Sequence, residues 1–110
     1  MELLNRDQLK ERAAKLAKTA RVQIAELDAE LELRRLKPTQ IIELAAGLQG
    51  DKTEQLTAMM QAVAWGCEAI GDTETLEEIG LPFGVIVELF DGVAKLSGLD
   101  GKEVTAKAGN

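Results

Sequence analysis

The spacing of the apolar residues changes from helical to alternating near Arg21, and this change constrains the fold more than any other feature of the sequence. Val22 and Ile24 alternate with polar or small residues, and Leu31 and Leu33 do so again after a short turn. A period of two places the apolar side chains on one face of a β-strand. The pattern predicts a two-stranded antiparallel hairpin near residues 21–36. Good helix formers fill the same stretch, so one continuous helix is the alternative, but the alternation favours the hairpin.

Helical spacing on both sides of this hairpin predicts an α+β, mainly α fold with four to five helices and one small two-stranded antiparallel hairpin. Residues 1–20 read as a helix, with Asn5 as N-cap and Gln8 completing a capping box. The apolar stripe of this helix is narrow and rich in alanine. We therefore expect it to be loosely attached, or to be an arm that packs on another chain.

Proline and glycine positions mark the remaining helices. The expected segments are a helix from Pro38 ended by Gly47 and Gly50, a longer helix from about Lys52 that weakens around Gly66 to Gly71, a short turn opened by a Thr75–Glu78 capping box and stopped by Gly80, and a last helix from Pro82 to Gly98. The chain is predicted to be one domain, with a core over 21–100. Residues 101–110 are expected to be a flexible tail because they hold little apolar content.

Composition argues against catalysis. The 110 residues carry a net charge of −6, no histidine and a single cysteine, Cys67. The common zinc sites and every Ser-His or Cys-His pair are therefore excluded. The carboxylate pairs Glu30/Glu32 and Glu77/Glu78 lack the pattern of a calcium loop, and the glycines match no phosphate-binding motif. We expect no enzyme activity and no cofactor.

Nucleic acids and membranes are also disfavoured as partners. The chain is acidic and only 3% aromatic, whereas a nucleic-acid surface needs positive charge and, for single strands, stacking rings. The longest run without a polar side chain, residues 79–87, is too short to span a bilayer.

Charge is distributed unevenly along the chain: residues 1–50 carry a net charge of +1 and residues 51–110 a net charge of −7. Complementary fields of this kind can orient a neighbouring copy, although solvated surfaces of different sign are the plainer interpretation.

Single residues with distinctive chemistry have structural explanations. Cys67 lies in an apolar stretch without an activating partner, which predicts a buried small hydrophobe. Trp65 is expected in the core, with a partner contact as the alternative. The basic cluster at Arg34, Arg35 and Lys37 is expected to pair with acidic groups of this or another chain. Two glycines inside the last predicted helix, at 84 and 92, suit close contact with another helix.

Contact with other chains is the remaining function class. The last helix is apolar around most of its circumference, and methionine adapts to irregular surfaces. The partner-binding candidates are Phe83, Ile86, Val87, Phe90, Met59 and Met60. An isolated hairpin must lay its apolar face on helices or pair with a second subunit. The self-association candidates are Val22, Ile24, Leu31, Leu33, Arg34 and Arg35.

The order of these elements and several motifs resembles the tail assembly chaperones of long-tailed bacteriophages over about residues 20–110. The motifs are Leu31-Glu32-Leu33-Arg34-Arg35-Leu36 running into Pro38-Thr39-Gln40-Ile41, and a closing pattern of Leu81-Pro82, Val85, Leu89-Phe90 and Leu96-Ser97-Gly98-Leu99. The acidic turn at Gly71-Asp72-Thr73 is shorter than is usual in that family.

The resemblance implies a role in tail morphogenesis in the host cytoplasm, and absence from the finished virion. Such proteins bind the tape measure protein, keep it soluble and help to recruit tail tube subunits. A longer product made by a programmed frameshift often contacts the tail tube protein, and Ala108-Gly109-Asn110 is compatible with a G-GGA-AAC slippery heptamer. Self-association is expected as well. The alternatives are a virion structural protein, such as a head–tail joining subunit, and a small regulatory protein-binding adaptor.

Overall fold

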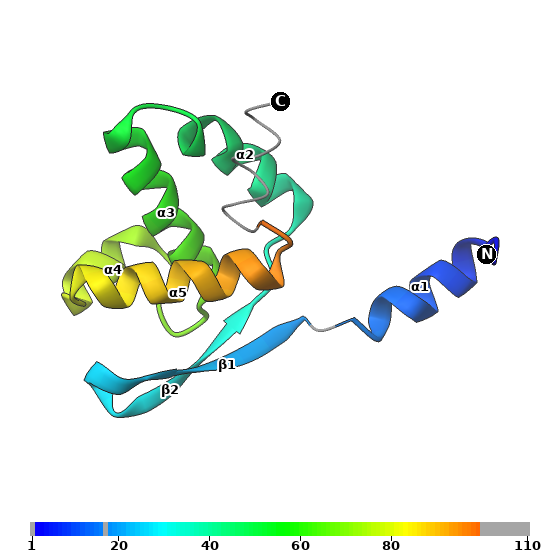
Figure 1. The fold of residues 1–110 in the computed structure, drawn as a ribbon, viewed down its shortest axis with the longest axis horizontal. Coiled ribbons are helices and arrows are strands. Elements are labelled where there is room, and N and C mark those ends of the chain that lie inside the picture. The colour runs from blue at the N-terminus through cyan, green and yellow to red at the C-terminus, as the bar shows by residue number, and fades with distance from the viewer. Residues whose placement is uncertain (1, 17, 100–110) are drawn as a thin grey trace.

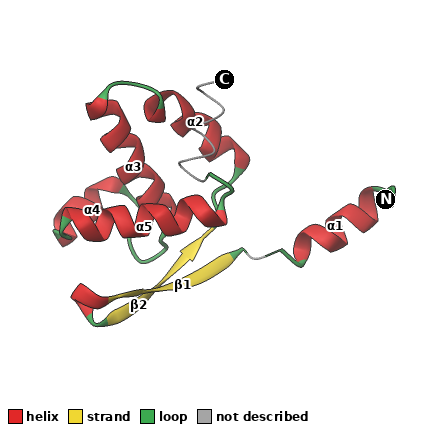
Figure 2. Cartoon of the chain, viewed as in Figure 1, coloured by secondary structure: helices red, strands yellow, loops and turns green. Residues whose placement is uncertain are grey.

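A two-stranded hairpin packs beneath a group of helices in the computed structural model, which describes residues 2–16 and 18–99 (Figures 1 and 2). The elements in chain order are α1 (Arg6–Ala14), β1 (Thr19–Ile24), a 3₁₀ turn (Ala25–Leu27), β2 (Ala29–Arg34), α2 (Pro38–Leu48), α3 (Lys52–Gly66), α4 (Thr73–Ile79) and α5 (Phe83–Leu96). The α+β, mainly α class is confirmed. The predicted tail at 101–110 lies outside the described residues.

The hairpin is confirmed, and the continuous helix over the same residues is wrong. β1 and β2 pair antiparallel in a register that sets Val22 opposite Leu31 and Arg21 opposite Glu32. Asp28 adopts the left-handed conformation with φ 49°, which an aspartate tolerates better than most residues and which lets the chain reverse. The apolar face lies on α5, so the hairpin buries that face within its own chain (Figure 1).

The core lies where α3 and α5 cross and where both meet the hairpin. Ile24, Leu33, Val63, Leu89 and Val93 are fully buried there. Glycines allow two close approaches between elements. A Cβ on Gly66 of α3 would lie 2.4 Å from Val93 Cγ2 of α5, and a Cβ on Gly92 of α5 would lie 2.5 Å from Leu33 Cδ1 of β2.

Neither of the two glycines predicted to suit close helix contact meets a second helix in the described part of the chain. The element that approaches Gly92 is the hairpin, not a helix, because Leu33 and Val22 are the side chains nearest to it. A Cβ added at Gly84 would face open space among the described residues, with no neighbouring atom within 4 Å. Periodicity placed both glycines on the last helix, but the identity of the neighbour depends on tertiary packing.

Several helix boundaries differ from expectation. Gly47 does not end α2, which continues to Leu48. This glycine instead lies against α3, where a Cβ added at Gly47 would be 3.0 Å from Ala58 Cβ. The Thr75–Glu78 capping box is wrong as well. Asp72 is the N-cap of α4, and its Oδ1 accepts the Thr75 backbone N–H at 2.7 Å. Asp and Thr are both good caps, and the aspartate lies earlier in the chain, so the helix starts there.

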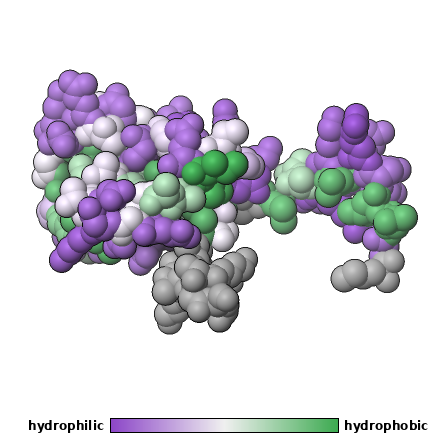
Figure 3. Space-filling view, turned by 90° about the horizontal axis from the view of Figure 1, so that it is seen from above, coloured by the Kyte–Doolittle hydropathy of each residue, from purple (hydrophilic) through white to green (hydrophobic). Residues whose placement is uncertain are grey.

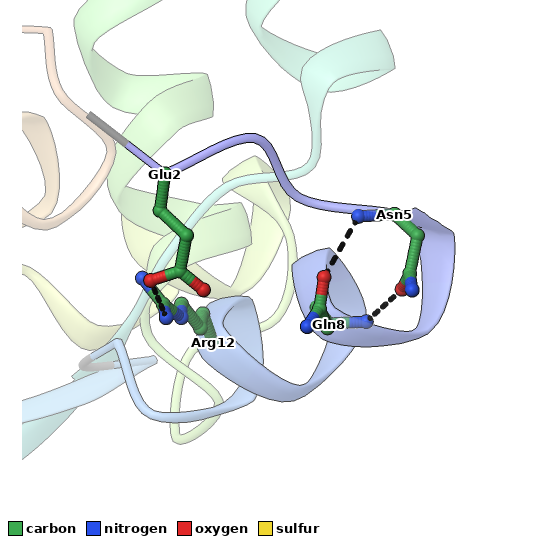
Figure 4. A network of polar contacts seen from close by, with 4 residues as sticks. All are labelled: Glu2, Asn5, Gln8 and Arg12. Carbon is green, nitrogen blue, oxygen red and sulfur yellow. Dashed lines mark hydrogen bonds and ion pairs between the residues drawn. The ribbon is translucent and has the colours of Figure 1, made fainter.

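The N-terminal helix is shorter than expected and stands away from the rest of the chain. α1 covers only Arg6–Ala14, while Thr19 and Ala20 already belong to β1. The predicted capping box is confirmed: Asn5 Oδ1 accepts the Gln8 N–H at 2.9 Å, and Gln8 Oε1 accepts the Asn5 N–H at 3.0 Å (Figure 4). No residue of α1 is buried, and Figure 1 shows it projecting from the start of β1.

Candidate functional site

The predicted apolar stripe of α5 is open to solvent at one end. Phe83 is 54% exposed at the first position of the helix, and Val87 is half-buried one turn later. Phe90 is half-buried and packs against the core, and Ile86 is only 8% exposed. Ile86 therefore serves mainly the core, while Phe83 and Val87 remain accessible to another chain.

A second exposed apolar residue, Ile79, lies just before this helix and was not singled out by sequence reasoning. Ile79 ends α4 and is 49% exposed. Gly80 follows with φ 72°, a left-handed conformation that favours glycine and stops the helix. Leu81 is half-buried in the short connection to α5. We refer to Ile79, Leu81, Phe83 and Val87 as the α4–α5 corner.

The two methionine candidates lie on α3. Met59 and Met60 are both half-buried, and Met60 packs against the core. α3 is the central helix, in contact with α2, α4 and α5. The methionines therefore supply partly accessible apolar surface on an element separate from the corner.

Among the hairpin candidates, the structure separates buried side chains from accessible ones. Ile24 and Leu33 are fully buried against the helices, and Val22 and Leu31 are half-buried against the same core. This burial removes Ile24 and Leu33 from any contact surface of the folded chain. The reason is that α5 covers the face of the hairpin on which they lie.

The outer edge of β1 remains available for backbone pairing. The Arg35 N–H donates to the Lys18 carbonyl at 2.7 Å, and hydrogen-bonded pairs alternate along an antiparallel ladder. The N–H and C=O groups of Thr19, Arg21 and Gln23 consequently point away from β2. Within the described part of the chain β1 has no second strand neighbour. Such an edge can accept another strand.

Among the described residues, the basic cluster forms no ion pair with an acidic group. Arg34 Nε donates a hydrogen bond to the Trp65 carbonyl at 2.8 Å, near the end of α3. The last carbonyls of a helix have no partner inside the helix, which explains why a cation binds there. Over residues 2–16 and 18–99 the one ion pair joins Arg12 to Glu2 at 2.6 Å.

Two surface grooves were not apparent from the sequence, because each joins residues from separate elements. The α2–α3 groove has a volume of about 390 Å³ and is lined by Glu43, Leu44, Gly47, Thr53, Glu54, Thr57, Ala58, Gln61 and Trp65. The β1–α5 groove has a volume of about 460 Å³ and is lined by Ala20, Val22, Glu88, Asp91, Gly92, Lys95 and Leu96. The first groove carries only acidic charge, whereas the second carries charges of both signs.

The carboxylates and the cysteine singled out in the sequence occupy surface, capping and core positions. Glu30, Glu32, Glu77 and Glu78 are exposed, as expected. The Thr75 backbone N–H and then its side chain lower the pKa of Asp72 through hydrogen bonds to the carboxylate, as befits a helix cap. Cys67 is fully buried, which confirms its predicted place in the core. Across the described residues, no group of three or more acidic or cysteine side chains is arranged to hold a metal ion.

Comparison of the chain with protein-family models, with curated proteins and with solved structures finds no match in any of the three. None of the described helices combines the length and apolar character needed to cross a bilayer.

Proposed function

We propose that this protein is a phage tail assembly chaperone that binds the tape measure protein in the host cytoplasm, keeps it soluble and helps to recruit tail tube subunits. The observation that carries the proposal is the α4–α5 corner, where Ile79 at the end of α4 and Phe83 at the start of α5 each expose about half of their surface, and Val87 is half-buried one helical turn after Phe83. An exposed aromatic residue beside aliphatic ones suits the apolar face of a partner helix. The motif resemblance supplies the identity of that partner.

The partner-binding experiment is co-expression with the tape measure protein encoded nearby, followed by a solubility assay and pull-down. The wild-type chain should make the tape measure protein soluble and co-purify with it. Phe83→Asp should reduce recovery of the complex by about tenfold or more, the factor for losing one well-placed apolar anchor. The substitution preserves the fold, because Phe83 is exposed and a carboxylate at the first position of a helix is favourable.

Ile42→Asp is the matched control, because Ile42 is 72% exposed on α2 and lies outside the corner. It should leave recovery unchanged. If the tape measure protein stays insoluble and nothing binds, the proposal fails, and purified particles should then be searched for the protein as a structural component. Equal losses with Phe83→Asp and Ile42→Asp would show that the corner is not the binding surface.

A further inference from the structure

Helix α1 carries an apolar stripe whose leucines are exposed in the described part of the chain. Leu9 and Leu16 are 59% and 61% exposed, and Ala13 lies between them at helical spacing. The Leu16 N–H donates to the Ala13 carbonyl at 3.1 Å, so the turn after the helix keeps Leu16 close to the stripe. Figure 3 shows apolar side chains exposed among hydrophilic ones on this projecting part of the molecule. A stripe this exposed indicates a missing partner.

The charges of α1 are sorted around that stripe. At about 100° per residue, Arg6 and Lys10 lie about 60° and 100° from Leu9, whereas Asp7 and Glu11 lie about 160° from it. Arg6 and Lys10 therefore flank the leucines on one side, whereas Arg12, about 60° from Leu9 on the other side, is neutralised by Glu2, and Asp7 and Glu11 face away. Glu2 pairs with Arg12 and holds the N-terminal segment against the helix (Figure 4). A surface that accepts this stripe needs an apolar floor with acidic residues at its sides.

The α2–α3 groove has these properties. Leu44, Ala58 and Trp65 supply apolar surface, and Glu43 and Glu54 are its only charged lining residues. The β1–α5 groove fits less well, because Lys95 would face the basic flank of α1. Length also matches: α1 has 9 residues, α2 has 11 and α3 has 15, so the groove walls are longer than the helix that they would hold.

We propose that α1 is an exchange arm that docks in the α2–α3 groove of a second copy of this chain. Leu9 and Leu16 would contact the apolar floor, and Arg6 and Lys10 would face Glu43 and Glu54. Mutual exchange between two copies gives a closed dimer, and exchange passed from copy to copy gives a ring or an open filament. This self-association does not depend on the tape measure protein, so it stands or falls separately from the proposed function.

The test measures the mass of the full-length protein by light scattering over a range of concentrations, together with the emission of Trp65. Trp65 is the only tryptophan and lines the groove, so its emission should change as copies associate. Leu9→Glu should weaken association by about tenfold to a hundredfold, because it removes a leucine that docking would bury and places a carboxylate against an acidic groove. Ile42→Glu, an equal change at an exposed site of α2 that does not line the groove, should leave it unchanged.

A mixing experiment separates exchange between copies from folding back within one copy. Glu43→Lys damages the groove and keeps the arm, whereas Leu9→Glu damages the arm and keeps the groove. Each variant alone should associate weakly, and their mixture should associate more strongly through the one intact arm and the one intact groove. The proposal is overturned if the wild-type chain stays monomeric, if Leu9→Glu associates like the wild type, or if mixing restores nothing.

Discussion

The contact between α3 and α5 depends on the absence of a side chain at Gly66. A Cβ at this position would lie 2.4 Å from Val93 Cγ2, 2.7 Å from Cγ1 and 3.1 Å from Cβ. Carbon atoms pack best at about 3.5–4.0 Å, so Gly66→Ala must push the helices apart by about 1 Å or turn Val93 out of its rotamer. Val93 is fully buried and β-branched, which leaves it little freedom to turn.

The cost follows from the type of contact. Adding a methyl group to a filled core costs about 1–3 kcal/mol, and three close atoms on a stiff side chain place Gly66→Ala near the upper end. Replacing glycine in a helix returns at most about 1 kcal/mol. The net loss in the free energy of unfolding should be about 2 kcal/mol. Val93→Ala alone should cost about 2–3 kcal/mol from lost burial and the cavity that remains.

The double variant Gly66→Ala/Val93→Ala tests the geometry directly. The new methyl group occupies space that the valine vacates, so the double variant should lose only about 1–2 kcal/mol instead of the sum of about 4–5 kcal/mol. Urea unfolding followed by Trp65 emission and far-UV circular dichroism measures the free energy of unfolding of the wild type, of both single variants and of the double variant. Gly84→Ala is the control, because nothing lies within 4 Å of its built Cβ, and it should gain up to about 1 kcal/mol. A Gly66→Ala protein as stable as wild type, or additive losses in the double variant, would refute the reasoning.

Two further predictions concern the hairpin and the cap of α4. Gly92→Ala should lower stability by about 1–2 kcal/mol and speed amide hydrogen exchange in β1 and β2, because the new methyl group would press on buried Leu33; unchanged exchange would contradict this. The pKa of Asp72 lies below its ordinary value of 3.8 in the folded chain, so its carboxylate stabilises the fold above that pH, and this contribution is lost as pH falls through the folded pKa. Asp72→Asn keeps a good cap but does not titrate, so urea unfolding from pH 6 to pH 3 should show the wild type losing more stability than the variant; parallel curves would contradict it.

Local signals in the sequence determined the elements of this fold. The alternation of Val22, Ile24, Leu31 and Leu33 specifies a hairpin against the helix propensity of its residues, because only a strand puts all four on one face. Asn5 with Gln8 fixes the start of α1 through hydrogen bonds three residues apart. The same reasoning failed at the start of α4, because Asp72 and Thr75 are equally good N-cap residues and Asp72 is the one that caps the helix.

Tertiary structure alone decided which apolar residues are core and which are surface. Periodicity placed Phe83, Ile86, Val87 and Phe90 on one stripe of α5, but the packing of the other elements buries Ile86 and leaves Phe83 open. The Arg34–Trp65 hydrogen bond spans 31 positions, and both grooves combine residues from two elements. A single sequence shows the spacing of apolar side chains along each helix or strand. It does not show which element covers each apolar face, because that depends on how distant segments pack against one another.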